Sequence, residues 1–514
     1  MAEGFEPRIV AFCCRWCAYA GADLAGTSRI SYPPNVRIIR VMCTGMVDEG
    51  YIMKAFEEGA DGVLVAGCHP GDCHYVSGNL KAEKEVERVK KLLDAVGIGS
   101  GRLRLEWVSA SEGEKFAKVV AEFVDELKKL GPSPIKPAKG RAKGSQTRSA
   151  DSPGEGNLKP GVGRVSAEGD PPRTFAEKLL ASDLLWRCIG CYLCSTRCPT
   201  GAVNPEFIKP LRSLATRDEA DLYCAHGAVP GMIARMLTNP ELKPNRMYWI
   251  PEDAKISSHG EILYFVGCSP YYDIIFEDLE LKETEISANA IRILNKLGIT
   301  PVVLPDERCC GHDILWTGDY ENFEKLARMN VKLIENSGAS TVITSCPECY
   351  RTIKVDYADL LGGLNFEVMH ISEFLSKMID EGKLKFEKRL NRKVTYQDPC
   401  RLGRQLGVYD PPRRVITSIP GVELVEMERS RENSACCGVS SWLLCGELAK
   451  KMQLDRLREA METGADQLIT SCHKCRIHFT CTLNEKLPEG YENLKVEVVN
   501  LESLVAEALG IEPK

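Results

Sequence analysis

The stretch ERCCGHD, residues 307–313, sets two cysteines side by side ahead of a glycine, and SACCGVS, residues 434–440, does so again. Adjacent cysteines form a strained eight-membered ring if they pair, and two such thiols do not easily point into one apolar core. Because the arrangement occurs twice, chance adjacency is a poor explanation. The paired cysteines therefore indicate a bound group, and the flanking sequence shows how far the duplication extends.

Each half of the duplication contains further cysteines on both sides of the pair. One cysteine precedes the pair and a C-x2-C motif follows it, at nearly constant offsets between the halves. The approach to the last motif also matches, as TVITSC in one half and QLITSC in the other. The first half contains Cys268, Cys309, Cys310, Cys346 and Cys349, and the second contains Cys400, Cys436, Cys437, Cys472 and Cys475.

Strand-like and helical segments alternate in both halves. The strand-like segments EILYFVGC (261–268) and KVTYQDPC (393–400) lead to the first cysteine, and segments with helical spacing such as SANAIRILNKLG follow. This alternation predicts a parallel sheet with its site beyond the carboxyl ends of the strands, so that the cysteines of each half share one crevice. Five thiolates are one more than a cubane needs, and adjacent cysteines that project apart suit two irons of one cluster.

Composition limits the class of protein. At roughly 100 to 200 residues per domain, 514 residues predict three or four domains. Hydrophobic residues make up 44% and charged residues 27% of the chain, and a formal net charge of -6 gives no indication of a nucleic-acid partner. Neither a membrane span nor a signal peptide is indicated, and we expect a cytoplasmic protein.

Twenty-three cysteines are anomalous in such a protein, because a reducing cytosol does not favour a disulfide scaffold. They form three clusters, with six cysteines before residue 75, five between residues 188 and 224, and twelve from residue 268 to residue 481. Metal binding is the natural explanation, and the clusters predict three cofactor-bearing regions. Cys445 and Cys481 belong to no motif and are most simply buried thiols.

Three short apolar runs in the first region end in cysteine, namely RIVAFCC (8–14), VRIIRVMC (36–43) and DGVLVAGC (61–68). Helical spacing between them predicts another parallel sheet, with cysteines at the carboxyl ends of its strands. Four of these thiols would hold either a structural zinc ion or a small iron–sulphur cluster, and the spacing alone does not decide. The candidates are Cys13, Cys14, Cys17, Cys43, Cys68 and Cys73.

A resemblance bears on that choice. The phrases AFCCRWCAYAGADLAG, YPPNVRIIRVMCTG and GADGVLVAGCHPGDCHY, within about residues 5–130, resemble the delta, or iron–sulphur, subunit of methyl-viologen-reducing hydrogenases from methanogenic archaea. That family carries a [2Fe-2S] cluster and hands electrons to a flavoprotein, so the resemblance favours iron–sulphur over zinc. It does not say which four of the six cysteines are ligands.

The second region contains CIGCYLCSTRCP (188–199), the C-x2-C-x2-C-x3-C-P run of bacterial ferredoxins that wraps a [4Fe-4S] cubane. A zinc ribbon is the alternative. In two-cluster ferredoxins the fourth cysteine serves the other cluster, yet no second run is present here. The fourth ligand is therefore Cys198, which we favour, or Cys224, in addition to Cys188, Cys191 and Cys194.

The duplication also suggests a reaction. Iron–sulphur clusters transfer one electron at a time, whereas splitting an S–S bond takes two, so a disulfide held between two facing clusters would be reduced without a flavin in this chain. Neither a P-loop nor a convincing G-x-G-x-x-G is present. His312 and His473 would donate protons to product thiolates or only pack, and Trp316 and Trp442 would shield the clusters.

The whole pattern over about residues 260–510 is similar to the cysteine-rich CCG domains of heterodisulfide reductase, and the ferredoxin run resembles the electron-feeding subunit of that enzyme. The resemblance implies that the ten duplicated cysteines hold two noncubane [4Fe-4S] clusters, which reduce the mixed disulfide of coenzyme M and coenzyme B. It implies two partners, a hydrogenase or formate dehydrogenase-type electron donor and a flavin-containing heterodisulfide reductase subunit.

Two alternatives remain from the sequence. Related CCG proteins oxidise lactate or glycerol phosphate, so the chain would instead be an electron relay for another substrate or thiol system; a zinc-bound scaffold is the other alternative. Both repeats keep all five cysteines, which favours the disulfide enzyme.

Composition also predicts the boundaries. Residues 131–174 are rich in Pro, Gly, Ser and Lys without a hydrophobic period, which predicts a flexible tether that joins two once-separate polypeptides and makes few demands on geometry. We expect an α/β protein with a parallel-sheet domain at 1–130, a small α-helical ferredoxin-type [4Fe-4S] module at 175–256, and duplicated α/β CCG domains at 257–390 and 391–514.

Overall fold

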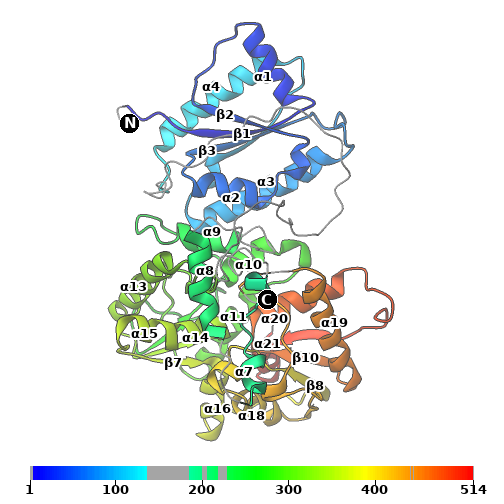
Figure 1. Cartoon of the computed structure of the whole chain (residues 1–514). Helices are drawn as coiled ribbons and strands as arrows, with labels where there is room; N and C mark the ends of the chain where they lie inside the picture. The colour runs from blue at the N-terminus through cyan, green and yellow to red at the C-terminus, as the bar shows by residue number, and fades with distance from the viewer. Residues whose placement is uncertain are drawn as a thin grey trace, which may run out of the picture.

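The computed structural model describes residues 4–135, 184–199, 205–217, 229–439, 441–443 and 445–512. Most of the predicted tether and Cys224 lie outside these ranges. Within them the chain forms three sheets, one in the amino-terminal domain and one in each CCG repeat, and every strand pairing is parallel. The predicted α/β class with parallel sheets is confirmed. Figure 1 shows the amino-terminal domain above the two repeats.

The amino-terminal sheet has the strand order β2-β1-β3-β4. Its strands are β1 (Ile9–Cys14), β2 (Val36–Val41), β3 (Gly62–Gly67) and β4 (Leu103–Trp107). Helices α1 (Ala18–Thr27) and α4 (Gly113–Leu130) lie on one face, and α2 (Glu49–Glu57) and α3 (Gly78–Val96) lie on the other (Figure 1). The three cysteine-ending runs are therefore strands, as predicted, and the central strand β3 is buried along its whole length.

The two CCG repeats have the same topology. The first sheet contains β5 (Ile262–Phe265), β6 (Thr341–Thr344) and β7 (Glu367–His370) in the order β5-β6-β7. The second contains β8 (Arg392–Gln397), β9 (Val422–Leu424), β10 (Gln467–Thr470) and β11 (Glu497–Asn500) in the order β11-β10-β8-β9. An isolated parallel bridge between Leu263 and Val302 occupies the place of β9 in the first repeat. The duplication in the sequence is thus a duplication of the sheet.

Corresponding helices follow corresponding strands. In the first repeat these are α10 (Ser269–Ile275), α11 (Thr284–Lys296), α12 (His312–Trp316), α13 (Tyr320–Asn336), α14 (Pro347–Arg351), α15 (Ala358–Leu361) and α16 (Ile371–Asp380). In the second they are α17 (Gly403–Leu406), α18 (Asp410–Ser418), α19 (Glu447–Glu462), α20 (His473–Asn484) and α21 (Leu501–Ala508).

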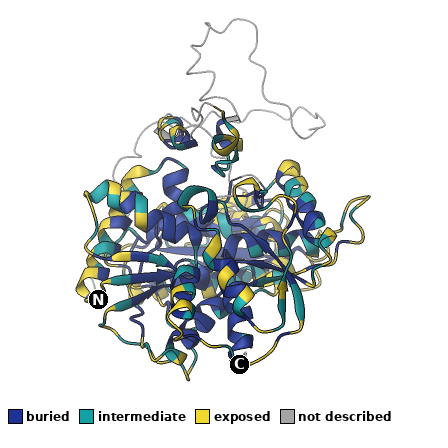
Figure 2. Cartoon of the chain, turned by 90° about the horizontal axis from the view of Figure 1, so that it is seen from below, coloured by how far each residue is buried: buried dark blue, intermediate teal, exposed yellow. Residues whose placement is uncertain are grey.

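The two repeats pack on each other through two equivalent helix pairs. Helix α11 of the first repeat lies against α21 of the second, and α16 of the first lies against α18 of the second. Because α11 corresponds to α18 and α16 to α21, this is an approximate two-fold arrangement. One apolar core runs through the contact, with Ile291 and Leu375 from one repeat and Val415 and Leu504 from the other. Figure 2 shows buried residues in the interior of the molecule and exposed residues mainly at its periphery.

The ferredoxin run lies in a region of short helices. These are α6 (Leu184–Arg187), α7 (Leu193–Arg197), α8 (Ile208–Arg217) and α9 (Val229–Met236). Helix α8 contacts α12 of the first repeat, and the loop around α7 contacts the second repeat. The run is therefore held against both repeats.

The amino-terminal domain packs directly on the short-helix region and on the first repeat. Helix α2 lies against α9, and α3 lies against α10, the helix that begins directly after Cys268. Arg88 of α3 pairs with Asp278 at 3.0 Å, and Lys91 pairs with Glu277 at 2.7 Å. Apolar side chains of both parts form one continuous core. The folded surfaces themselves therefore hold the amino-terminal domain against the rest of the described chain.

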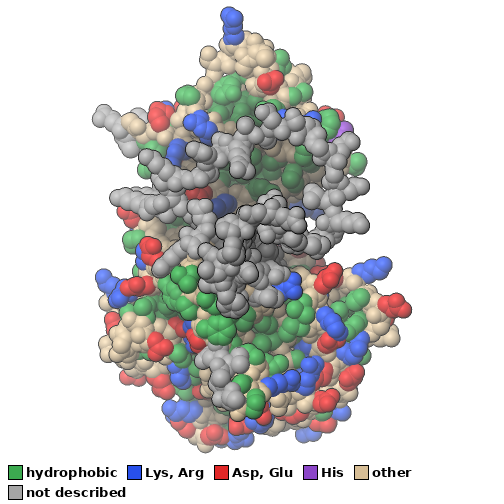
Figure 3. All heavy atoms as spheres, in the orientation of Figure 1, with side chains coloured by type: hydrophobic (Ala, Val, Ile, Leu, Met, Phe, Trp, Pro, Cys, Tyr) green, Lys and Arg blue, Asp and Glu red, His purple; other side chains and the backbone are tan. Residues whose placement is uncertain are grey.

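On the face seen in Figure 3, acidic and basic side chains are interspersed over the lower part of the molecule. Among the described residues, no helix combines the length and the apolarity required to cross a bilayer.

Candidate metal centres

The five cysteines of the first repeat meet in one buried place. Cys268 follows β5, the adjacent pair lies in the turn before α12, and the C-x2-C motif forms the start of α14. The Sγ atoms of Cys268 and Cys309 lie 3.6 Å apart. All five line one small cavity, whose cysteines are Cys268, Cys309, Cys310, Cys346 and Cys349.

The second repeat repeats this arrangement. Cys437 interacts with Cys436 and Cys475, and Cys475 interacts in turn with Cys472. Cys400 completes the group through its contact with Cys436. The structure therefore gathers the ten cysteines of the duplication into two groups of five.

The glycine after each cysteine pair has a steric cause. Gly311 has φ +82° and Gly438 has φ +84°, a left-handed conformation that side chains with a Cβ rarely adopt. A Cβ on Gly311 would lie 2.9 Å from the Phe323 ring, and a Cβ on Gly438 would lie 2.8 Å from the carbonyl oxygen of Ala449. The turn that separates the two thiols thus requires glycine at its next position.

The two sites face each other across the contact between the repeats. His473 lines the cavity of the first site although it belongs to the C-x2-C motif of the second. Lys474, its neighbour, is buried and pairs with Asp313 at 2.5 Å and with Glu348 at 2.6 Å, both from the first repeat. The side chain of Cys472 lies close enough to Cys346 for the charge of one to raise the pKa of the other.

Both candidate histidines are buried and hydrogen-bonded. His312 accepts from Arg401 Nε at 3.0 Å through its Nε2 atom, which places its proton on Nδ1, 2.9 Å from Asp313. Burial lowers the pKa of His312, so this ring is neutral. Burial alone would also lower the pKa of His473, but its hydrogen bond with Glu283 at 2.8 Å raises it.

The two tryptophans lie where the modules meet. Trp442 stacks on Phe276 with ring centroids 5.0 Å apart and so joins the second repeat to the first. Trp316 lies under the Arg401 guanidinium at 4.2 Å, and a Cβ on Gly190 of the ferredoxin run would lie 2.4 Å from it. Both rings are fully buried beside the sites.

The amino-terminal cysteines gather at the carboxyl ends of β1 and β3. The Sγ atoms of Cys14, Cys17 and Cys68 all lie within 4.8 Å of one another. Cys43 and Cys73 form an interacting pair near them. A Cβ on Gly78 would lie 2.1 Å from Cys43 Sγ and 3.3 Å from Cys73 Sγ, so the start of α3 leaves room for these two sulphurs.

Cys13 is separated from that group. It precedes Cys14 on β1, and successive strand residues point to opposite faces of a sheet. Burial raises the pKa of Cys13 to about 12, as expected for a thiol enclosed in the core. The strand position of the adjacent cysteines contained this signal, which sequence reasoning missed.

Three cysteines of the ferredoxin run, Cys188, Cys191 and Cys194, line a cavity of about 520 Å³. Gly438 and Leu448 of the second repeat line the same cavity, and Cys191 contacts Cys436. The structure does not decide between the two candidates for the fourth ligand, because Cys198 does not line this cavity and Cys224 lies outside the described residues.

Buried arginines near the cysteines were also missed from the sequence. Arg246 pairs with Glu307 at 2.8 Å, and Glu307 accepts from the backbone N–H groups of Val266 and Gly267, directly before Cys268. In the second repeat Arg404 donates to the carbonyl oxygen of Cys191 at 2.6 Å. No pattern in the sequence marks either arginine, because neither belongs to a cysteine motif and each comes near the cysteines only in the folded chain.

Two predictions for single cysteines are wrong in part. Cys445 and Cys481 are half-buried and not enclosed in the core. Cys481 lies near the end of α20, where Lys450 Nζ donates to its sulphur at 3.5 Å and also pairs with Glu485. Charged neighbours on the surface side therefore keep this thiol partly exposed.

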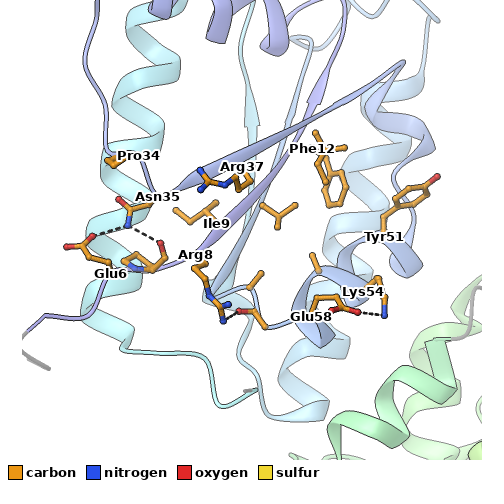
Figure 4. Close-up of a pocket in the computed structure, with 16 residues that line it drawn as sticks. Glu6, Arg8, Ile9, Phe12, Pro34, Asn35, Arg37, Tyr51, Lys54 and Glu58 are labelled. Atoms are coloured by element: carbon orange, nitrogen blue, oxygen red, sulfur yellow. Dashed lines mark hydrogen bonds and ion pairs between the residues drawn. The ribbon is translucent and has the colours of Figure 1, made fainter. Parts of the chain in front are cut away.

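A further cavity of about 620 Å³ lies along the edge strand β2 (Figure 4). Phe12 and Tyr51 supply apolar surface, and Lys54 pairs with Glu58 at 2.6 Å on the rim. None of the described residues that line it is a cysteine, so it is separate from the metal centres.

Comparison with known proteins agrees with this division of the chain. Residues 9–131 match the model of the methyl-viologen-reducing hydrogenase delta subunit, and residues 262–354 and 394–480 match the cysteine-rich domain. The D subunit of dihydromethanophenazine:CoB–CoM heterodisulfide reductase from Methanosarcina acetivorans is 37% identical over 335 residues, which cover 63% of this chain and 78% of the relative. The chain belongs to the family of heterodisulfide reductase D subunits.

Relatives of another kind match shorter stretches of the chain. The iron–sulphur D subunit of the F420-non-reducing hydrogenase vhc from Methanococcus voltae is 52% identical over 141 residues, 27% of this chain and 98% of that protein. The A subunit of ferredoxin:CoB–CoM heterodisulfide reductase from Methanosarcina mazei is 48% identical over 126 residues, 24% of this chain and 16% of that protein. In this heterodisulfide reductase chain, a hydrogenase-type iron–sulphur domain is thus fused to the part that carries the CCG repeats, and the recognised fusion is confirmed.

The donor sets fit iron–sulphur clusters, the class of cofactor that the family implies. All described cysteines are free thiols. Contact with Cys309 and burial raise the pKa of Cys268 well above its usual range, and iron would replace the protons that crowd such a site. Arg246 Nη1 and Arg404 Nη2 are buried without a hydrogen-bond partner among the described residues, and cluster sulphurs would accept from them.

Proposed function

We propose that this chain is the disulfide-reducing and electron-transfer component of a heterodisulfide reductase-type complex, and that its substrate is the disulfide of coenzyme M and coenzyme B. The observation that carries the proposal is the pair of buried five-cysteine groups facing each other, with His473 of one repeat lining the site of the other. Each cluster supplies one-electron chemistry, and two clusters together match the two electrons that an S–S bond requires.

The ligand assignment is part of the proposal. The ten CCG cysteines would hold two noncubane [4Fe-4S] clusters, and Cys188, Cys191 and Cys194, with Cys198 or Cys224, would hold a [4Fe-4S] cubane. Four of the five gathered amino-terminal cysteines would hold a [2Fe-2S] cluster, and Cys13 would hold none. The supporting observation for Cys13 is its place on the opposite face of β1.

The residues of the chain prepare the site in other ways. Tyr272, Trp316 and Trp442 are buried around the cysteines and exclude water from them. The ion pairs of Lys474 with Asp313 and Glu348 hold the C-x2-C turns of the two repeats together. His473, whose proton is held against Glu283, is placed to supply protons to product thiols.

The amino-terminal domain would be the entrance for electrons. Residues 9–131 match the hydrogenase delta-subunit model, and the stretch shared with the hydrogenase iron–sulphur relative covers 98% of that protein. The stretch shared with the ferredoxin:CoB–CoM heterodisulfide reductase relative covers 16% of that protein. We therefore propose two partners, a hydrogenase or formate dehydrogenase-type donor and a separate flavin-containing heterodisulfide reductase subunit. An electron relay for another substrate is the second candidate, since CCG domains alone do not fix the substrate.

The direct test uses anaerobically purified protein with all clusters loaded. Reduced viologen and the mixed disulfide should yield two thiols per disulfide without added flavin. A simple hydroxy acid serves as the control substrate. If the hydroxy acid is turned over and the disulfide is not, the chain would instead be assigned as an electron relay for another substrate.

A further inference from the structure

The two repeats keep the same ligands but differ in the charges beside them. The first cysteine of the first repeat, Cys268, is followed at the next and the fourth positions by Ser269 and Tyr272. The same positions after Cys400 in the second repeat are Arg401 and Arg404. The duplicated halves therefore share their cysteines, but only the second has cations at these two positions.

Arg404 lies between two of the candidate metal centres. Its Nε donates to the carbonyl oxygen of Cys191 in the ferredoxin run at 2.6 Å, and its Nη1 donates to the carbonyl oxygen of Ser434, two residues before Cys436. Burial opposes the charge of Arg404, but the thiolates of Cys400, Cys436 and Cys191 raise its pKa. The guanidinium thus faces the ferredoxin run on one side and the second CCG site on the other.

The charged groups that act on this guanidinium among the described residues are thiols and a tyrosine, with no carboxylate among them. Its buried Nη2 has no hydrogen-bond acceptor in the described part of the chain. An unpartnered N–H on a buried cation is unusual, because burial without an acceptor carries a large desolvation cost. Cluster sulphur at Cys400 and Cys436 is the acceptor that the surroundings leave available.

Two cations beside the first site are paired with carboxylates. Arg246 is paired with the buried carboxylate of Glu307 at 2.8 Å. Lys474 is shared between Asp313 at 2.5 Å and Glu348 at 2.6 Å, so two carboxylates balance one ammonium group. The first site therefore has carboxylates around it, where the second has an uncompensated guanidinium.

This difference acts on reduction directly. Reduction adds negative charge to a site, and a buried unpaired cation stabilises that charge while nearby carboxylates oppose it. We propose that Arg404 makes the second CCG site the easier of the two to reduce and hence the first to receive electrons from the ferredoxin-type module. The inference rests on the proposed function, which supplies the clusters, and Arg404 acts as a positioning residue through them.

The test is a redox titration of the full-length, iron-loaded chain followed by electron paramagnetic resonance. The signal of each repeat is assigned with Cys310→Ala, which removes the first, and Cys437→Ala, which removes the second. In the unaltered chain the second-repeat signal should change at the higher potential. Arg404→Gln should lower the equilibrium constant for reduction of the second site about tenfold, which lowers its reduction potential by ~59 mV for a one-electron couple. The potential of the first-repeat signal should not change.

Two variants serve as controls. Arg404→Lys keeps the charge and should retain most of the potential, even if the hydrogen bond to the Cys191 carbonyl is weakened. Arg414→Gln removes an exposed arginine that pairs with Asp380 at 2.9 Å, and it should shift neither signal. Iron content is measured for every variant, so that a lost cluster is not taken for a shifted one.

A second-repeat signal at the lower potential in the unaltered chain would overturn the inference, even if Arg404→Gln failed to hold its iron. Unchanged potentials in an iron-loaded Arg404→Gln chain would overturn it as well. The proposed function fails separately, since an unreactive disulfide in the viologen assay with the potentials ordered as expected would reject the substrate and keep the role of Arg404.

Discussion

The amino-terminal cysteines and the CCG cysteines differ in how closely the protein surrounds them. Beside the amino-terminal group, Trp16 is 43% exposed, Tyr75 46% and Val76 85%. Beside the first CCG group, Tyr272 and Trp316 are buried. An open site with apolar neighbours is suited to exchange electrons with another protein, whereas a closed site is suited to chemistry away from water. The same residue type thus lies in two different enclosures, one suited to exchange of electrons and the other to chemistry.

The largest effect should come from breaking a closed site. Cys310→Ala or Cys437→Ala removes one ligand of a five-cysteine group, and each should abolish viologen-driven disulfide reduction while the amino-terminal and ferredoxin-type clusters remain. Iron and sulphide analysis with electron paramagnetic resonance measures the loss. Cys481→Ala, which alters a half-buried thiol outside both groups, is the matched control. Full iron and full rate in either ligand variant would refute the five-cysteine assignment.

Breaking the open site should affect only one route of electron entry. Cys14→Ala should remove the amino-terminal cluster and the reduction driven by the donor through the flavin-containing partner, because the proposed route brings those electrons in there. Viologen reaches the other clusters, so viologen-driven reduction should continue. The control is Cys13→Ala, on the opposite face of β1, which should keep the cluster. Loss of the cluster in Cys13→Ala, with Cys14→Ala intact, would reverse our assignment.

A smaller effect tests the turn that encloses the CCG pair. Gly438→Ala combines a left-handed φ of +84° with a Cβ 2.8 Å from a backbone oxygen, and should destabilise the fold by about 3 kcal/mol. Gly298→Ala has a similar φ of +78° but no atom within 4 Å, and should cost about 1 kcal/mol. Thermal unfolding midpoints of both variants are compared. Equal midpoints would show that backbone strain, and not the close contact, requires glycine in this turn.

The smallest effect concerns the seam between the open domain and the first repeat. Lys91→Ala removes an exposed pair with Glu277 and should weaken docking by about 0.5 kcal/mol. Arg88→Ala should weaken docking more. This arginine pairs with Asp278 across the seam, and its pairs with Glu49 and Glu85 of its own domain hold the side chain in position for that contact. Hydrogen exchange at α10 reports the docking. Unchanged exchange in Arg88→Ala would assign the seam to its apolar contacts alone.

The sequence predicted the elements whose pattern is local. The strands before Cys14, Cys43 and Cys68 follow from short β-branched runs, and the strands before Cys268 and Cys400 follow from the duplication. Strand β4, LRLEW, was not predicted, because its charged residues interrupt the apolar pattern and only its first residue, Leu103, is buried. The opposite directions of Cys13 and Cys14 were available from strand alternation alone.

Features that depend on distant segments were not predictable. The pairing of Arg246 with Glu307 and of Lys474 with Glu348 depends on segments far apart in the chain. The packing of α3 on α10 likewise cannot be predicted from the composition of residues 131–174. That composition indicates only that the two parts of the chain are joined. The sequence therefore predicts which cysteines come together better than it predicts the charges that surround them.

The two equivalent helix pairs between the CCG repeats bear on how the chain could have evolved. Because α11 lies on α21 and α16 on α18, a half of the pair made by itself would leave both of these faces bare. A single half could bury these faces by forming a dimer, since the surface of α11 and α16 is complementary to a second copy of itself. An ancestral single repeat would then have worked as a symmetric dimer, with two identical cysteine groups face to face. Joining the two halves in one chain would have freed each to mutate alone, and the two sites now differ, with Arg404 in one where the other has Tyr272.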